Sequence, residues 1–107
     1  MIRGTTPDYI LNVSGEDLRD KTVYVTISQG TKKITMSNDE IGINSDGTDS
    51  VIDVRLTQEQ TLGFQEGNAK IQVRFINSQG NAEATEIVGI TILPVLLERV
   101  IEYNGNS

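Results

Sequence analysis

The stretch Val23-Tyr24-Val25-Thr26-Ile27-Ser28-Gln29-Gly30 decides the fold class of this chain. Its branched apolar residues alternate with polar or amphipathic ones, which is the pattern of a β-strand with one buried face. Gln29-Gly30 then predicts a turn, and residues 33–36 can return as the second arm of a hairpin, with Ile34 and Met36 facing inward. The sequence therefore predicts an antiparallel β-hairpin at this point.

Period-two alternation recurs on both sides of the hairpin. Tyr9, Leu11 and Val13 share one face directly after Pro7, which suits the start of an edge strand. Asp46-Gly47 predicts a hairpin turn, because both residues tolerate positive φ. The other predicted strands are 40–43, 50–56 with Ile52, Val54 and Leu56 inward, a strand after 66–68 with Ile71, Val73 and Phe75 inward, and a β-rich stretch at 82–93.

One segment, 57–64, departs from this alternation. Thr57-Gln58-Glu59-Gln60 matches a capping box, so one or two helical turns are expected to place Leu62 and Phe64 on the core. About seven short strands with one short helical crossover predict an all-β fold, an antiparallel Ig-like β-sandwich. The chain would form a single domain over 1–107, with an extended N-terminal arm at 1–7 and a short polar C-terminal tail at 102–107.

The composition removes several classes of function. The 107 residues include no Cys and no His, which excludes thiol and imidazole nucleophiles, Ser-His-Asp triads, zinc fingers and disulfide frameworks. A formal charge of −6 argues against nucleic acid as a partner. The most apolar segment, 87–101, is interrupted by glycine, proline and charged residues, so we expect no membrane span. The N-terminus lacks the apolar stretch of a secretory signal, so synthesis in a cytoplasm is expected.

Two patterns resemble sites, and each has a plainer explanation. Residues 44–49 carry oxygen ligands at alternate positions, like the start of a calcium loop, but Arg55 stands where the closing acid should be. The carboxylate pairs Asp17 and Asp20, and Glu83 and Glu86, are neighbours only in sequence and lie in polar stretches. We therefore predict no catalytic residue, no metal site, no cofactor and no enzymatic activity.

The C-terminal segment after Pro94 is the most informative feature. Leu96-Leu97 and Val100-Ile101 repeat at a spacing of four, which a short amphipathic helix would gather on one face; a bent last strand is the alternative. These apolar residues either complete the chain's own core or form a docking strip for another subunit. The candidate partner-binding residues are Leu96, Leu97, Val100 and Ile101, together with Ile2 and Arg3 of the N-terminal arm.

Three segments carry a family resemblance. They are Ile2-Arg3-Gly4-Thr5-Thr6-Pro7, the hairpin stretch 23–30, and residues 56–64 with the following Lys70-Ile71-Gln72-Val73-Arg74. With these segments the chain resembles a group of small proteins encoded in the structural-gene regions of tailed bacteriophages and prophages of Gram-positive bacteria. It is also loosely similar to the N-terminal β-sandwich domain of phage upper baseplate proteins.

The resemblance implies a non-enzymatic structural or assembly protein of the virion, such as a tail or baseplate adaptor or an accessory subunit. Its partners would be other virion proteins or further copies of this chain, and it would be made in the bacterial host cytoplasm. A capsid decoration or head-fibre protein is one alternative. A glycan-binding surface module is another, in which Tyr24 would be the one aromatic ring displayed by a strand.

Overall fold

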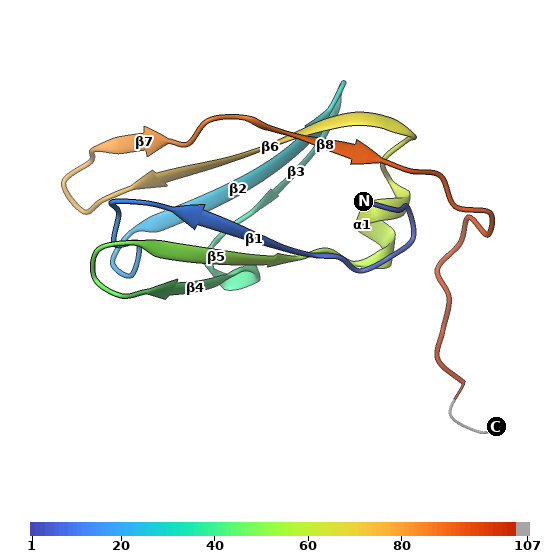
Figure 1. Cartoon of the computed structure of the whole chain (residues 1–107), viewed down its shortest axis with the longest axis horizontal. Helices are drawn as coiled ribbons and strands as arrows, with labels where there is room; N and C mark the ends of the chain where they lie inside the picture. The colour runs from blue at the N-terminus through green and yellow to red at the C-terminus, as the bar shows by residue number, and fades with distance from the viewer. Residues whose placement is uncertain (105–107) are drawn as a thin grey trace.

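The chain forms two antiparallel β-sheets packed face to face, described for residues 1–104 by a computed structural model (Figure 1). The smaller sheet has the strand order β1-β5-β4, and the larger sheet has the order β3-β2-β6-β7 with β8 also paired to β6. The bounds are β1 (Asp8–Val13), β2 (Thr22–Gln29), β3 (Lys32–Met36), a 3₁₀ turn (Asn38–Glu40), β4 (Gly42–Ser45), β5 (Ser50–Arg55), α1 (Gln58–Leu62), β6 (Gly67–Ile76), β7 (Ala82–Ala84) and β8 (Val88–Ile92).

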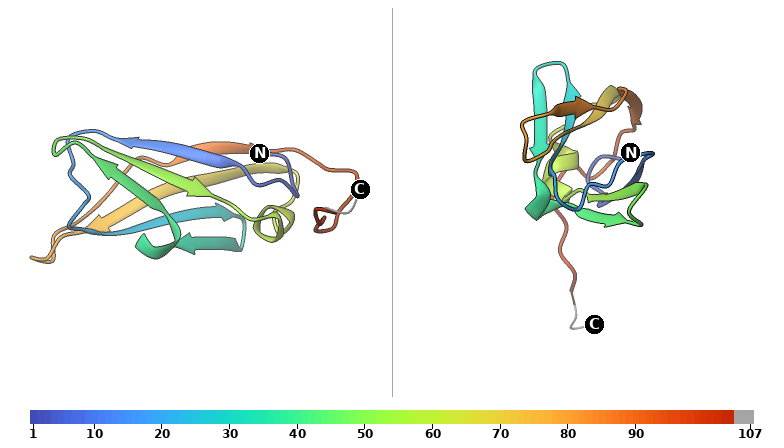
Figure 2. Two further views of the ribbon diagram at one scale, coloured as in Figure 1. Left: turned by 90° about the horizontal axis from the view of Figure 1, so that it is seen from below. Right: turned by 90° about the vertical axis from the view of Figure 1, so that its left-hand side faces the viewer.

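This architecture confirms the predicted β-sandwich, with eight strands in the described part of the chain rather than seven. The view along the long axis separates the two sheets, with β2 and β3 on one side and β1, β4 and β5 on the other (Figure 2, right). Their strand orders correspond to B-E-D and C′-C-F-G of an Ig-type sandwich. The additional short strand, β7, pairs with the far end of β6.

The core lies between the sheets and is built by the predicted alternation. Val23, Val25 and Ile27 of β2 are completely buried. The other buried apolar residues come from both sheets and the connections: Val13, Leu18, Met36, Ile52, Val54, Leu56, Phe64, Ala69, Ile71, Val73, Phe75, Ile90 and Ile92. Each large side chain among them contributes about 1.5–3 kcal/mol relative to an exposed position.

Leu18 is a core residue that lies outside any strand. Its backbone N–H donates to Ser50 Oγ at 2.9 Å, and the Ser50 hydroxyl in turn donates to the Glu16 carbonyl at 2.7 Å. Ser50 is itself buried, so these two bonds satisfy a hydroxyl that would otherwise be costly to bury. The β1–β2 connection is therefore held against the start of β5.

Two local predictions need correction. The strand expected at 40–43 begins later, because Asn38–Glu40 form a 3₁₀ turn in which the Glu40 carboxylate accepts from the Ser37 N–H. In the 57–64 crossover, Phe64 is buried as predicted, but Leu62 is only half-buried. Leu62 lies against Gly4, where a Cβ atom would come within 3.3 Å of Leu62 Cδ2. Gly4 has a φ of +78°, so the N-terminal arm turns there at a position that favours glycine.

The C-terminal segment is neither helix nor strand. After β8 the chain bends at residues 96, 97 and 99 and runs away from the sandwich at the end where α1 lies (Figure 1). Its apolar side chains are absent from the core, so the prediction that they might complete it is wrong. Of the polar tail expected at 102–107, residues 105–107 lie outside the described residues. Within residues 1–104 no helix is long and apolar enough to span a lipid bilayer.

Candidate functional site

The N-terminal arm lies along the end of β8. Ile2 pairs in parallel with Leu93, and the backbone bonds run from Leu93 N–H to the Met1 carbonyl at 2.7 Å and from Arg3 N–H to the Leu93 carbonyl at 3.1 Å. The Met1 ammonium donates to the Thr91 carbonyl at 2.8 Å. The first three residues are thus bound to the chain's own last strand, and the Ile2 side chain remains exposed.

Arg3 joins three segments at the α1 end of the sandwich. Its Nε donates to the Phe64 carbonyl at 2.6 Å, and its Nη2 donates to the Leu62 carbonyl at 3.0 Å. Its Nη1 forms an ion pair with Glu98 of the C-terminal segment. A cation suits this place, because the carbonyls at the end of a helix carry partial negative charge. The Arg3 side chain is only 17% exposed, so its bonds are made within the chain.

The other four predicted partner-binding residues form an exposed apolar strip, hereafter the tail strip: Leu96, Leu97, Val100 and Ile101. Leu96 is fully exposed, and Leu97, Val100 and Ile101 are 50%, 40% and 54% exposed. The amide of Gln58 holds the backbone of Ile101 by accepting its N–H at 2.7 Å and donating to its carbonyl at 3.0 Å. The structure therefore brings the tail strip and Arg3 to one end of the molecule, beside α1.

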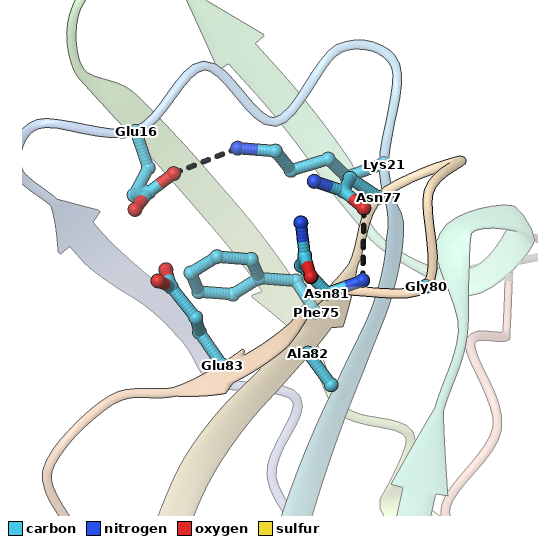
Figure 3. A pocket seen from close by; sticks show the side chains of 8 residues that line it. All are labelled: Glu16, Lys21, Phe75, Asn77, Gly80, Asn81, Ala82 and Glu83. Carbon is cyan, nitrogen blue, oxygen red and sulfur yellow. Dashed lines mark hydrogen bonds and ion pairs between the residues drawn. The ribbon is translucent and has the colours of Figure 1, made fainter.

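A second feature is a polar hollow of about 530 Å³ between the β1–β2 connection and the β6–β7 hairpin (Figure 3). Lys21 Nζ lies 2.7 Å from Glu16 Oε2 and 5.5 Å from the centre of the Phe75 ring. Glu83 lines the same hollow from β7, so its carboxylate and that of Glu16 share one hollow (Figure 3). Asn77 and Asn81 complete its polar wall.

The two glutamates of this hollow have opposite pKa shifts. The hydrogen bond from Lys21 lowers the pKa of Glu16, whereas the neighbouring Glu16 carboxylate raises the pKa of Glu83. A carboxyl and a carboxylate can share a proton, but this hollow opens to solvent, and Glu83 is exposed. The arrangement is that of a surface charge cluster.

The carboxylate pairs suggested by sequence proximity are not the pairs that form. Asp17 receives two bonds from Arg19, at 2.9 and 2.6 Å, which hold its pKa well below the usual range. Glu83 shares its hollow with Glu16, which raises the pKa of Glu83, whereas Glu86 does not line that hollow. Only the folding of β6 and β7 across the β1–β2 connection brings Glu16 and Glu83 together, so no local spacing in the sequence could have predicted this pair.

The loop that resembled a calcium site uses its carboxylates to bind backbone N–H groups. Asp46 Oδ1 accepts from Thr48 at 2.9 Å and from Asp49 at 2.8 Å, and Asp49 Oδ1 accepts from Gly15 at 2.7 Å. Gly47 has a φ of +95°, so the predicted turn is present, with positive φ at the glycine alone. Among residues 1–104 there is no group of three or more acidic side chains placed to hold a metal ion.

The chain matches no protein-family model and no curated protein sequence.

Proposed function

We propose that this protein is a non-enzymatic structural or assembly protein of a tailed-phage virion, acting as a tail or baseplate adaptor or accessory subunit. It docks on other virion proteins through the tail strip and the adjoining N-terminal arm. The exposure of the tail strip is the observation that carries the proposal. Scattered apolar side chains are ordinary on protein surfaces, whereas four exposed ones within six consecutive residues concentrate apolar surface in the way that marks an interaction site.

The anchoring of this segment supports the same function. The Arg3–Glu98 ion pair and the Gln58–Ile101 bonds fix two points of the segment against the α1 end. In the free protein these contacts hold the segment beside α1, where its apolar side chains are open to a partner. The N-terminal arm and the anchored part of the C-terminal segment lie at the same end of the sandwich, so one partner could contact the arm and the tail strip together.

The proposal is tested on particles purified from a bacterium whose prophage carries the gene. We expect mass spectrometry to find the protein in the particles, and immunogold electron microscopy to place it on the tail. Labelling on the head would instead support the capsid decoration alternative. Absence from purified particles would contradict a structural role in the virion.

The matched variants are Leu97→Asp with Val100→Asp for the tail strip, and Tyr24→Asp for an exposed apolar residue elsewhere. The double variant should remain folded and be lost from the particles, because two buried carboxylates would oppose docking. Tyr24→Asp should be incorporated normally. If the double variant fails to fold, the tail strip stabilises the chain's own core, and the proposal is overturned.

A glycan-binding module remains the second candidate, favoured by one observation. A shallow hollow of about 370 Å³ lies on the outer face of the larger sheet, lined by Tyr24, Thr26, Thr35, Arg74 and Ile76 among others. An exposed tyrosine beside an arginine offers a ring face and hydrogen-bond donors to a sugar. Binding on a bacterial glycan array that Tyr24→Ala abolishes would favour this function, and a blank array would remove it.

A further inference from the structure

The smaller sheet has an open edge along β1. In the sheet order β1-β5-β4, β1 pairs on one side only, with β5. Leu56 N–H donates to the Pro7 carbonyl in the same register, which makes Pro7–Leu56 a hydrogen-bonded pair. Because such pairs alternate along an antiparallel ladder, Tyr9 and Leu11 bond to β5, and the backbone groups of Ile10 and Asn12 point away from the sheet.

An apolar groove of about 490 Å³ runs beside this edge, between the two sheets. Leu11 and Val13 of β1 form one wall, and Ile71, Val73 and Val88 form much of the other. Ile10 and Val88 are 58% and 55% exposed at its mouth. Open backbone groups next to exposed apolar side chains are the features that receive an added β-strand.

The fold explains why the groove is open. With β1 in the place of strand B, an Ig-type sandwich has a further strand A that covers the edge of B. Here the residues before β1 do not cover it, because Met1–Arg3 are bound to the end of β8. Within residues 1–104 the smaller sheet is therefore one strand short of the full pattern.

The facing edge of the larger sheet is less suited to receive a strand. The pairing of β6 shifts by one residue between β7, where Arg74 faces Ala84, and β8, where Ile71 faces Val88. This shift is a bulge, and bulges interrupt regular pairing. The end of β8 is covered by the N-terminal arm. The regular open edge on this side is that of β1.

We infer that this groove binds the C-terminal segment 95–101 of a second copy of the chain, which adds as a strand beside β1. This inference deepens the proposed assembly function and rests on it. The segment is apolar, exposed and unpaired by any strand, and seven extended residues span about 23 Å. That length matches the six residues of β1, at about 20 Å.

The side chains of the segment suit the groove. In an extended strand one face carries Val95, Leu97, Arg99 and Ile101, and the opposite face carries Leu96, Glu98 and Val100. The three apolar side chains of the first face can then enter the groove, while Arg99 carries the charge opposite to that of Glu86 in its lining. The segment must first leave Gln58 and Arg3, whose bonds to it are exposed at the surface and contribute little net stability.

The test uses the full chain and two variants with complementary defects. Leu97→Asp with Ile101→Asp disables the segment and keeps the groove. Asn12→Pro blocks the open edge of β1 without removing a bond to β5, because the N–H of Asn12 points outward. Light scattering measures the mass over a range of concentrations, and hydrogen exchange followed by NMR measures protection of the Ile10 and Asn12 amides.

We expect the mass of the full chain to rise from 11.7 kDa towards twice that value, with protection of both amides increasing about tenfold or more. Each variant alone should remain a folded monomer. An equimolar mixture of the two should form a heterodimer, since one supplies a segment and the other a groove. Recovery of association in the mixture excludes misfolding as the reason for the single defects.

Three results would overturn the inference. A monomer at all concentrations with unprotected amides would mean that no segment occupies the groove. A monomer with protected amides would assign the groove to the chain's own segment. A dimer that persists in both variants would place the interface elsewhere. Incorporation into phage particles is measured separately, so a monomeric protein that still enters the particle overturns this inference and leaves the proposed function standing.

Discussion

Arg3 connects three segments of the described chain. It donates to two backbone carbonyls at the C-terminal end of α1, those of Leu62 and Phe64, and forms an ion pair with Glu98. Replacing it by alanine leaves both carbonyls without their charged donor, and hydrogen bonds to charged groups contribute about 1.5–3 kcal/mol. We expect Arg3→Ala to lower the free energy of unfolding by about that amount in urea denaturation at pH 7.

Arg55→Ala is the matched control for Arg3. Arg55 is 69% exposed, and its Nη1 lies 3.9 Å from Asp8 Oδ2, so this ion pair is solvated. The control should change the free energy of unfolding by less than about 0.5 kcal/mol. An equal effect of both substitutions would mean that Arg3 acts only through its net charge and not through its bonds to the carbonyls.

Through Glu16 and Glu83 the free energy of unfolding should depend on pH, and the two glutamates should act in opposite directions. Glu16 has a lowered pKa in the folded state. Its contribution to the free energy of unfolding is therefore present above the ordinary pKa of 4.5 and is lost as pH falls through its folded pKa. Glu83 has a raised pKa in the folded state. Its contribution to the free energy of unfolding is therefore present below pH 4.5, the ordinary pKa, and is lost as pH rises through its folded pKa. NMR titration of the side-chain carboxyl carbons should therefore show Glu83 titrating at higher pH than Glu16.

Lys21→Met separates the causes of these two shifts. The hydrogen bond from Lys21 is the largest cause of the Glu16 shift, so its loss should raise the pKa of Glu16 towards the ordinary value. Lys33→Met removes an exposed lysine from β3, outside this hollow, and should leave both glutamates unchanged. A Glu16 pKa that does not respond to Lys21→Met would contradict the geometry of this cluster.

The short helix α1 begins with a capping box. Thr57 Oγ1 accepts from Gln60 N–H at 3.1 Å, and Gln60 Oε1 accepts from Thr57 N–H at 2.9 Å. Thr57→Ala removes one half of this capping box and should lower the free energy of unfolding by about 1 kcal/mol in thermal or urea denaturation. Thr57→Ser keeps the hydroxyl and should restore most of the loss; failure to do so would assign the effect to the lost methyl group.

The elements that the sequence predicted well are those set by local rules. The alternation through Val23, Val25 and Ile27 fixes β2, and the capping box fixes the start of α1 at the residue after Thr57. The strand predicted at 40–43 begins later because Asn38–Glu40 form a 3₁₀ turn. There the Glu40 carboxylate accepts from the Ser37 N–H, and this bond competes with strand pairing. Leu18 was missed because its burial depends on a distant partner, Ser50.

At the scale of the whole molecule, the candidate sites depend on which segments the sandwich brings together. The apolar character of the tail strip was visible in the sequence, and its exposure was not, because the same spacing of four fits a helix packed on the core. Arg3 was a candidate only because of its position in the N-terminal arm. Its bonds to the carbonyls of Leu62 and Phe64 could not be predicted from the sequence, because they join residues that only the fold brings together. Pro7 and the alternation through Tyr9, Leu11 and Val13 correctly predicted that β1 is an edge strand, but the groove beside it was not predicted, because its other wall comes from β6 and β8 of the larger sheet.

The tail strip also makes a prediction about the molecule as a unit of folding. A chain ending at Leu93 retains all sixteen buried apolar residues, because the last of them is Ile92. It loses the Arg3–Glu98 ion pair and the Gln58–Ile101 bonds, which are exposed contacts worth about 1 kcal/mol or less in total. We expect the shortened chain to keep its β-type circular dichroism spectrum and to melt cooperatively within a few degrees of the full chain. Unfolding on truncation would mean that the tail strip stabilises the core, and the surface for the proposed assembly would then have to be sought at the open strand edges alone.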